Sequence, residues 1–171
     1  IFDISNPALP VDVSGGGVST AAAPDSIYVQ GRYAYIGTGS ASNKLQVFDV
    51  SNPASPTDIS SGGVASTGAY VANIFVQGRY AYIVTGGAGS KIQVFNVTNP
   101  ASPASVGSTS TDGDSRYIYV QDRYAYVSSF ANDNLQVFDV STPSSPTDVS
   151  SGGVTTQSDP NLFVQGRYAY V

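Results

Sequence analysis

The sequence predicts an all-β protein, specifically a β-propeller of four-stranded antiparallel blades. The main observation is a ten-residue phrase that recurs four times, at 27–36, 74–83, 118–127 and 162–171, and reads IFVQGRYAYI at 74–83. Its arginines, Arg32, Arg79, Arg123 and Arg167, are 47, 44 and 44 residues apart. This spacing indicates about four repeat units of roughly 44 residues, which is the usual length of a propeller blade.

A second repeated phrase follows the first at a near-constant distance. It reads LQVFDVSNPASP at 45–56 and recurs with small changes at 92–103 and 135–146. Its last part also opens the chain, as IFDISNPALP at 1–10. Two phrases in regular alternation indicate one supersecondary unit repeated along the chain rather than one irregular domain.

Each unit is expected to contain four short strands. In the unit that begins at Ile74 these are runs at 74–77, 79–85, 91–97 and 104–108, rich in β-branched and aromatic residues and separated by Gly, Pro and Asn. No long segment has apolar residues at the 3.6-residue period of a helix. The sequence also has no Glu, no Met and only four Leu, so residues that favour helices are scarce. A β-sandwich is the alternative architecture, but it does not by itself explain near-identical units.

The second strand of the unit favours stacked blades. Tyr80 and Tyr82 are expected on one face of this strand, and Ala81 and Ile83 on the other. Both faces are apolar, so both need cover, and neighbouring blades supply it. The repeated tyrosines are therefore predicted to fill one recurrent slot between blades: Tyr35, Tyr82, Tyr126 and Tyr170.

The turns divide into two edges, because alternate turns of an up-and-down sheet lie at the same edge. The first and third turns of each unit repeat almost letter for letter, as Gln-Gly, with Asp122 once in place of Gly, and as Pro-x-x-Pro. We call their side the repeated edge. The second turn and the connection to the next unit differ in every copy, at 37–43, 65–73, 84–90, 109–116, 128–134 and 155–161. Any specific binding is expected at this variable edge.

Composition restricts the class of protein further. The net charge is −5 with only 11% charged residues, and four of the five arginines belong to the repeat, so nucleic acid is not an expected partner. No apolar stretch approaches the ~20 residues of a membrane-spanning helix. The absence of Cys excludes disulfides and thiolate metal sites. High Ser, Thr, Gly and Asn content favours an extracellular or cell-surface location.

The two phrases resemble the LVIVD-repeat family of β-propellers. That family combines a Gly-x-Tyr-Ala-Tyr-Val strand with a Leu-x-Val-hydrophobic-Asp-Val-Ser-x-Pro strand, here GRYAYI at 31–36 and LQVFDVSNP at 45–53. The resemblance covers essentially the whole chain. The sequence departs from the family pattern at Asn96, where other units have Asp, and at Asp122, where other units have Gly. It implies a propeller, often exported from a bacterial or archaeal cell, and implies little about activity because no catalytic motif defines the family.

Candidate chemistry lies on the variable edge. An enzyme is not expected, because the chain has no His, Cys or Glu to act as an ordinary general base. The repeated Arg and Asp residues are interpreted as blade-holding groups. The candidate ligand groups are the acidic residues Asp25, Asp112, Asp114, Asp133 and Asp159. Their carboxylates could bind calcium, and the alternative is that they are ordinary solvated loop residues. The aromatic residues Tyr70, Tyr117 and Phe130 could stack on a sugar or a partner protein.

These observations favour a non-enzymatic extracellular or cell-surface repeat protein that serves structure, adhesion or assembly. The alternative is a propeller that binds a glycan or calcium on its variable edge. No cofactor is expected beyond that calcium, and the identity of any metal is open.

The two ends of the chain suggest self-association. Residues 1–171 are predicted to form one propeller, or a segment of one, that starts and stops inside a blade, because Val171 aligns with Ile36 and Ile1 aligns with Val47. Four units could close alone, join a second copy into an eight-bladed dimer, form a head-to-tail filament, or belong to a longer array. The edges expected to pair are Ile1, Phe2, Asp3 and Ile4 at one end and Arg167, Tyr168, Ala169, Tyr170 and Val171 at the other.

Overall fold

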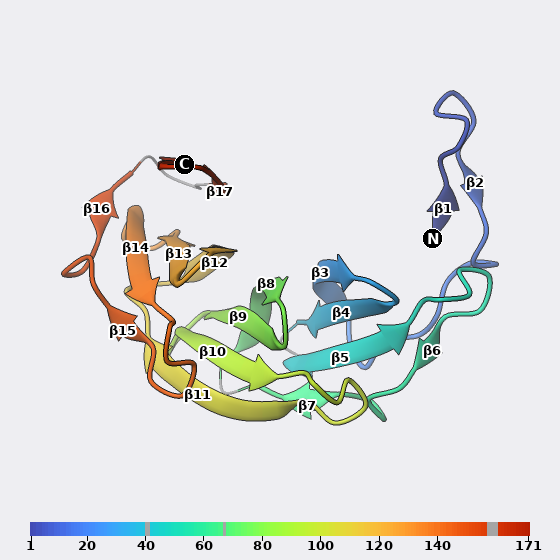
Figure 1. The fold of residues 1–171 in the computed structure, drawn as a ribbon, viewed down its shortest axis with the longest axis horizontal. Coiled ribbons are helices and arrows are strands. Elements are labelled where there is room, and N and C mark those ends of the chain that lie inside the picture. The colour runs from blue at the N-terminus through green and yellow to red at the C-terminus, as the bar shows by residue number, and fades with distance from the viewer. Residues whose placement is uncertain (40–41, 67, 157–160) are drawn as a thin grey trace.

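The computed structural model describes residues 1–39, 42–66, 68–156 and 161–171, and they form β-sheets that follow one another around an arc (Figure 1). The middle sheet, blade 2, consists of β8 (Tyr70–Gln77), β9 (Tyr80–Gly86), β10 (Lys91–Asn96) and β11 (Ala104–Ser110), all antiparallel and in sequence order. The described residues include no helix of the length and apolarity that crossing a membrane requires.

Two similar sheets flank blade 2. Blade 1 contains β3 (Pro24–Gln30), β4 (Tyr33–Thr38) and β5 (Lys44–Asp49), with β6 (Thr57–Asp58) and β7 (Val64–Ala65) both paired to β5. Blade 3 contains β12 (Ser115–Gln121), β13 (Tyr124–Ser129) and β14 (Asn134–Asp139), with β15 (Thr147–Asp148) and β16 (Val154–Thr155) both paired to β14. The prediction of four-stranded antiparallel blades is confirmed.

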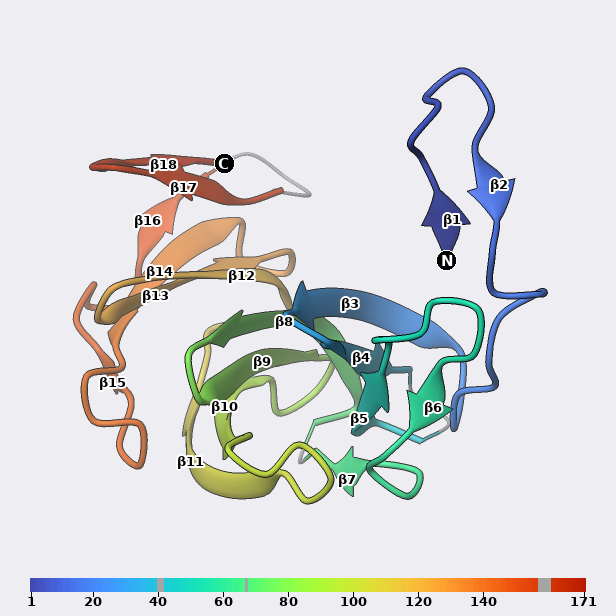
Figure 2. The ribbon, with the colours of Figure 1, turned by 45° about the vertical axis from the view of Figure 1, so that its right-hand side comes forward.

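A two-stranded sheet stands at each end of the arc. The N-terminal half-blade pairs β1 (Phe2–Asp3) with β2 (Val11–Asp12), and the C-terminal half-blade pairs β17 (Phe163–Gln165) with β18 (Tyr168–Tyr170). Figures 1 and 2 both show a wide opening between these two sheets. Among the described residues no hydrogen-bonded ladder joins them, so the chain does not close on itself into a four-bladed ring.

The fourth strand differs between blades for a local reason. In blades 1 and 3 a Ser-Ser-Gly-Gly segment splits it into two short pieces. At the split in blade 1, the Asp58 carboxylate accepts hydrogen bonds from the N–H groups of Ser60 and Gly62, and the Ser60 hydroxyl accepts one from the Val47 N–H at 2.9 Å. Blade 2 lacks this segment, and its fourth strand, β11, is continuous.

The core lies between the blades. Blade 1 contributes Tyr35 and Val47 to the first interface, and blade 2 contributes Ile74, Ala81 and Ile83. The second interface joins a different set of blade 2 residues to blade 3: Tyr82, Val84, Ile92 and Val94 with Ile118, Val120, Val127 and Phe138. Strand β9 therefore sends Ala81 and Ile83 to one neighbour and Tyr82 to the other, as its two apolar faces predict.

Two further contacts link successive blades at their first strands. Rings at equivalent positions of β3, β8, β12 and β17 form a ladder, with centroid separations of 4.9, 4.8 and 5.6 Å for Tyr28, Phe75, Tyr119 and Phe163. At the repeated edge the Nε2 atoms of Gln30 and Gln77 donate to the backbone carbonyls of Gly78 and Asp122 in the next blade, at 2.8 and 2.9 Å. These bonds explain why the repeat retains Gln before the turn.

The turns at the repeated edge need a left-handed residue after that Gln. Gly78 has φ of 61° and Asp122, in the same position, has φ of 56°. Glycine adopts this conformation without steric cost, and Asp is among the few other residues that tolerate it. Asp122 thus adopts the same left-handed conformation as the Gly that the other units have at this position.

Candidate functional site

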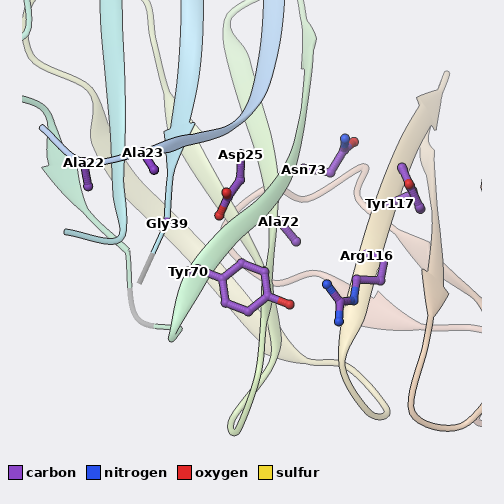
Figure 3. Close-up of a pocket in the computed structure, with 9 residues that line it drawn as sticks. All are labelled: Ala22, Ala23, Asp25, Gly39, Tyr70, Ala72, Asn73, Arg116 and Tyr117. Atoms are coloured by element: carbon purple, nitrogen blue, oxygen red, sulfur yellow. The ribbon is translucent and has the colours of Figure 1, made fainter. Parts of the chain in front are cut away.

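The variable edge contains an open pocket of about 540 Å³, shown in Figure 3. It lies where the first strands of three consecutive blades begin. The residues that line it are Ala22, Ala23, Asp25, Gly39, Tyr70, Ala72, Asn73, Arg116 and Tyr117. Its volume falls in the range of roughly 300–1,000 Å³ that is usual for small-molecule sites.

A β-bulge recurs at the start of each first strand and supplies part of this lining. The register with the second strand shifts between Pro24 and Ser26, between Val71 and Asn73, and between Ser115 and Tyr117. The extra residues at the three bulges are Asp25, Ala72 and Arg116, and all three line the pocket. Bulges commonly redirect a side chain beside a functional site. Here one repeated backbone feature presents a carboxylate, a methyl group and a guanidinium to the same space.

Arg116 is held in place from three sides. Its Nη2 donates to Asp114 Oδ2 at 2.8 Å, and its guanidinium carbon lies 5.8 Å from the Tyr70 ring centroid and 5.2 Å from that of Phe130. Cation–π contacts at these distances stabilise a fixed orientation. One ion-pair bond leaves the guanidinium with further N–H donors, and its Nε is buried without an acceptor among the described groups.

Asp114 organises the neighbouring donors but is itself fully engaged. Its Oδ1 accepts hydrogen bonds from the Tyr70 hydroxyl at 3.0 Å and from the Gly87 N–H at 2.7 Å. Burial, and then this bond to Asp114, raise the pKa of Tyr70 above its ordinary value, so the hydroxyl stays protonated and donates. Asp114 therefore positions Tyr70 and Arg116 and is not a free ligand group.

Asp25 differs from Asp114 because its carboxylate is exposed and no described group donates a hydrogen bond to it. It lies over Gly39, where an added Cβ would come within 3.1 Å of Asp25 Oδ2. Across the pocket, Asn73 Oδ1 accepts a bond from the Ile118 N–H at 3.3 Å, which fixes the amide between blades 2 and 3. Figure 3 shows the Tyr70 hydroxyl and the Arg116 guanidinium directed toward one another, with Asp25 beside Tyr70, on the side of the pocket that faces Arg116.

The predicted site residues that the structure describes separate into three groups: those that line the pocket, those behind it and those outside it. Asp25, Tyr70 and Tyr117 line the pocket, and Asp114 and Phe130 contact Arg116 from behind it. Asp112 lies outside the pocket and accepts hydrogen bonds from the side-chain amides of Asn132 and Asn134. Asp133 lies in the turn before β14 with φ of 45°. Asp159 lies outside the described residues.

The four candidate acidic residues that the structure describes, Asp25, Asp112, Asp114 and Asp133, do not form one acidic cluster. Within the described ranges, no three acidic side chains come together as a metal would require. Asp112 and Asp114 each face N–H or O–H donors, which occupy the oxygen lone pairs that a cation would use.

Two pocket residues were missed by the sequence reasoning, namely Arg116 and Asn73. For Arg116 a signal was available, because it is the one arginine of five that stands outside the repeated phrase. For Asn73 no such signal was available, because an Asn just before the predicted strand at 74–77 is common. Its place in the pocket depends on the position of blade 3.

The solved structures most usefully compared with this chain are propellers that share little sequence with it. A protein of Bacteroides uniformis described as a candidate 6-phosphogluconolactonase matches with a TM-score of 0.76 and 20% identity, over 91% of this chain and 48% of its own. A similarly described protein of Bacteroides fragilis gives 0.70 and 16%, over 82% and 41%. The computationally designed protein Ika4 gives 0.59 and 10%, over 88% and 85%.

At these identities the structural likeness shows the fold alone, and this chain spans less than half the length of both Bacteroides proteins. No curated protein matches the chain in sequence. The family model described as the LVIVD repeat matches residues 23–61, 68–111 and 112–153, one copy for each complete blade. With most of its length matched in this way and its blades observed, the chain belongs to the LVIVD-repeat family of β-propellers.

Proposed function

We propose that this chain is a non-enzymatic adhesion protein, extracellular or on the cell surface, that binds an uncharged glycan in the variable-edge pocket. The observation that carries the proposal is the recurrent bulge. Three blades share one backbone feature, yet Asp25, Ala72 and Arg116 occupy it. A repeat that served architecture alone would gain nothing from placing opposite charges at equivalent positions around one pocket.

The groups available in the pocket match the hydroxyls of a sugar. A hydroxyl both donates and accepts, so it can donate to the free carboxylate of Asp25 and accept from the remaining N–H groups of Arg116. The rings of Tyr70 and Tyr117 add apolar surface for the C–H face of a sugar ring. This combination of a few fixed polar groups with aromatic surface is typical of small-molecule sites.

Charge makes an uncharged ligand the better candidate. An anionic ligand that approaches Arg116 also meets Asp25, with Asp114 behind, and a cationic ligand that approaches Asp25 meets Arg116. Opposite charges on facing sides of the pocket favour a neutral ligand with many hydroxyl groups.

The residues of the pocket support binding rather than catalysis. The chain has no His, Cys or Glu, and both oxygens of Asp114 are engaged by donors. Glycoside hydrolysis ordinarily requires two carboxyl groups that share the acid and base roles. Asp25 has no second free carboxylate beside it in the pocket. The extracellular location rests on composition, which is poor in charge and rich in Ser, Thr and Gly.

Binding of neutral and anionic oligosaccharides, first on an array and then by calorimetry, tests the proposal. Asp25→Asn and Arg116→Gln should each weaken binding of a neutral glycan by about tenfold or more, equivalent to roughly 1.4 kcal/mol. Arg32→Gln is the matched control, because Arg32 pairs with Asp49 at the repeated edge, and it should bind as the unmodified chain does. Absence of neutral-glycan binding, or equal losses in all three variants, would refute the pocket assignment.

A further inference from the structure

One repeat position, at the end of the second strand, lies next to a pocket side chain or its support in each complete blade. It is occupied by Gly39, Gly86 and Phe130. Gly39 lies beside Asp25, and the Phe130 ring contacts the Arg116 guanidinium. Gly86 pairs across the sheet with Tyr70. Because the residue at this position differs between blades, it can decide what each blade presents to a ligand.

Gly86 is a glycine for reasons of space. Its φ lies outside the left-handed region that favours glycine. A Cβ added to Gly86 would come within 2.1 Å of Tyr70 Cζ, 2.2 Å of the Tyr70 hydroxyl oxygen and 2.7 Å of Asp114 Oδ1. The phenol ring therefore lies directly over the Gly86 backbone, and a side chain at this position would displace the ring.

Gly39 is the looser of the two glycine positions. An added Cβ there would come within 3.1 Å of Asp25 Oδ2, which a small movement of the carboxylate would relieve. The Tyr70 ring has less freedom to move, because its hydroxyl is bonded to Asp114 at 3.0 Å and its face lies under Arg116 at 5.8 Å. Gly86 is thus the position where an added methyl group would change the pocket most.

The close approach at Gly86 lets Tyr70 cross from blade 2 to blade 3. Asp114 occupies the position equivalent to Tyr70 one repeat later, because the Phe130 N–H donates to the Asp114 carbonyl just as Gly86 pairs with Tyr70. Blade 1 has Ala23 at this position, whose methyl group makes no such hydrogen bond. The link between equivalent residues of successive blades therefore belongs to blades 2 and 3.

The bond to Asp114 decides how the Tyr70 hydroxyl acts toward a ligand. A carboxylate only accepts hydrogen bonds, so the phenol proton is committed to Asp114 and the oxygen presents only lone pairs to the pocket. The carboxylate of Asp25 also only accepts, while the Arg116 guanidinium only donates. These three groups line the same pocket (Figure 3). The pocket therefore matches a ligand that donates two hydrogen bonds and accepts one.

We propose that Gly86 is a specificity-determining residue of the pocket, because it leaves room for Tyr70 to lie across the sheet with its oxygen as an acceptor. The inference rests on the proposed function, binding of a neutral glycan, and adds that this glycan presents free hydroxyl groups to Asp25 and Tyr70. A glycan with methylated hydroxyls accepts hydrogen bonds but cannot donate them. The pocket therefore selects unmethylated glycans.

The position of Tyr70 is tested without a ligand, by NMR titration of the chain labelled with ¹³C at tyrosine Cζ. The Tyr70→Phe variant identifies the Tyr70 signal. Burial, and then the bond to Asp114, raise the pKa of Tyr70. Gly86→Ala should bring this pKa back toward the ordinary value, because displacing the ring removes both causes. An unchanged Tyr70 pKa in folded Gly86→Ala would overturn the inference.

Gly107→Ala is the matched control for overpacking. Gly107 lies on β11, the strand of blade 2 farthest from β8, and its added Cβ would come within 2.4 Å of the Pro143 carbonyl oxygen. This variant should leave the Tyr70 titration unchanged. An equal shift of the Tyr70 pKa in both variants would show a general disturbance of blade 2 and would also overturn the inference.

A double variant shows whether Gly86→Ala acts through Tyr70, even if the single variant folds poorly. Gly86→Ala should lower the melting temperature of the unmodified chain but leave that of Tyr70→Ala nearly unchanged, because the ring that it meets is then absent. An equal loss in the two backgrounds would show that the glycine serves the backbone rather than Tyr70, which contradicts the proposed role.

Selectivity is tested by calorimetry with neutral disaccharides of glucose, galactose, mannose or N-acetylglucosamine, and with their fully O-methylated forms. The unmodified chain should bind at least one free disaccharide, and its methylated form at least about tenfold more weakly. Gly86→Ala and Tyr70→Phe should each weaken binding of that free disaccharide by about tenfold or more, and Gly107→Ala should leave it unchanged.

The possible failures are distinguishable. Equal binding of free and methylated forms, or undiminished binding by Gly86→Ala, would overturn the role of Gly86 in specificity while leaving glycan binding in place. Binding of none of these disaccharides by the unmodified chain would instead count against the proposed function and remove the specificity role with it. The titration would then still decide whether Gly86 positions Tyr70.

Discussion

Blade 2 and the two half-blades are built from the same phrases, yet blade 2 is the best-buried part of the molecule and the half-blades are the most exposed. Tyr82 of blade 2 is 4% exposed and Tyr170 of the C-terminal half-blade is 56% exposed, although the seven residues that precede each tyrosine, at 75–81 and 163–169, are identical. The difference shows that burial in this fold depends on having a neighbour on each side. The repeated phrase is therefore an interface sequence, apolar on both faces wherever it occurs.

The largest expected effect is the difference in stability lost when Tyr82 and Tyr170 are each replaced by Ala. Tyr82→Ala should lower the free energy of unfolding by roughly 3–5 kcal/mol, the usual cost of removing a large buried aromatic. Tyr170→Ala should cost less than about 1 kcal/mol in dilute solution, because an exposed side chain loses little on truncation. Urea denaturation followed by tyrosine fluorescence measures both values.

Tyr82→Phe is the control for that experiment, since it keeps the ring and removes only the hydroxyl. A cost for Tyr82→Ala below about 1 kcal/mol would contradict burial of this ring between blades 2 and 3. A cost for Tyr170→Ala as large as that for Tyr82→Ala would contradict the comparison, because it would show that the Tyr170 ring is covered in solution.

A smaller effect is expected at the repeated edge, where the bond from Gln77 to the Asp122 carbonyl joins blade 2 to blade 3. Gln77→Ala should cost about 0.5–1 kcal/mol, the net value of a typical exposed hydrogen bond. Gln165→Ala should be close to neutral, since the exposed side chain of Gln165 has no hydrogen-bond partner among the described residues. Equal losses at the two positions in paired denaturation curves would remove the inter-blade bond as the reason for the repeated Gln.

The smallest expected effect is the loss of stability at low pH through the aspartates that pair with Arg32 and Arg123. Hydrogen bonds from Ser141, and then the ion pair with Arg123, lower the pKa of Asp139 to about 2, and Arg32 and then Ser51 lower the pKa of Asp49 further. A depressed folded-state pKa contributes stability that is complete above the unfolded-state pKa, near 3.9, and is lost as the pH falls through the folded-state value.

Blade 2 has Asn96 at the equivalent position and no such titration. The Asp139→Asn variant should therefore have a lower melting temperature than the unmodified chain at neutral pH. This difference should shrink as the pH approaches about 2. Because both side chains of the pair reach solvent, salt should reduce the difference as well. Melting temperatures that differ by the same amount at every pH would show that the carboxylate charge has no part in the contact.

Much of the fold could be predicted from the sequence, because its strongest signals are local and repeated. The phrase around Arg79 specifies two strands and a left-handed turn, and its alternation of Tyr and Ala already implies a neighbour on each face. The division into a repeated and a variable edge follows from turn order alone. The sequence also predicted that any ligand would bind at the variable edge; Asp25, Tyr70 and Tyr117 line one pocket there, and ligand binding in that pocket stays a prediction.

The rest required the tertiary structure, because it depends on distances between blades. Nothing in the sequence distinguishes Asp25, which has a free carboxylate, from Asp114, which accepts from Tyr70, Gly87 and Arg116. The bulges that bring Asp25 and Arg116 into one space shift each strand by a single residue, and no local pattern marks them. The sequence by itself determined the blade, because strand period and turn chemistry act within a few residues. Only the tertiary structure decided the pocket and the open arc, because both arise from the angle at which one apolar face packs on the next.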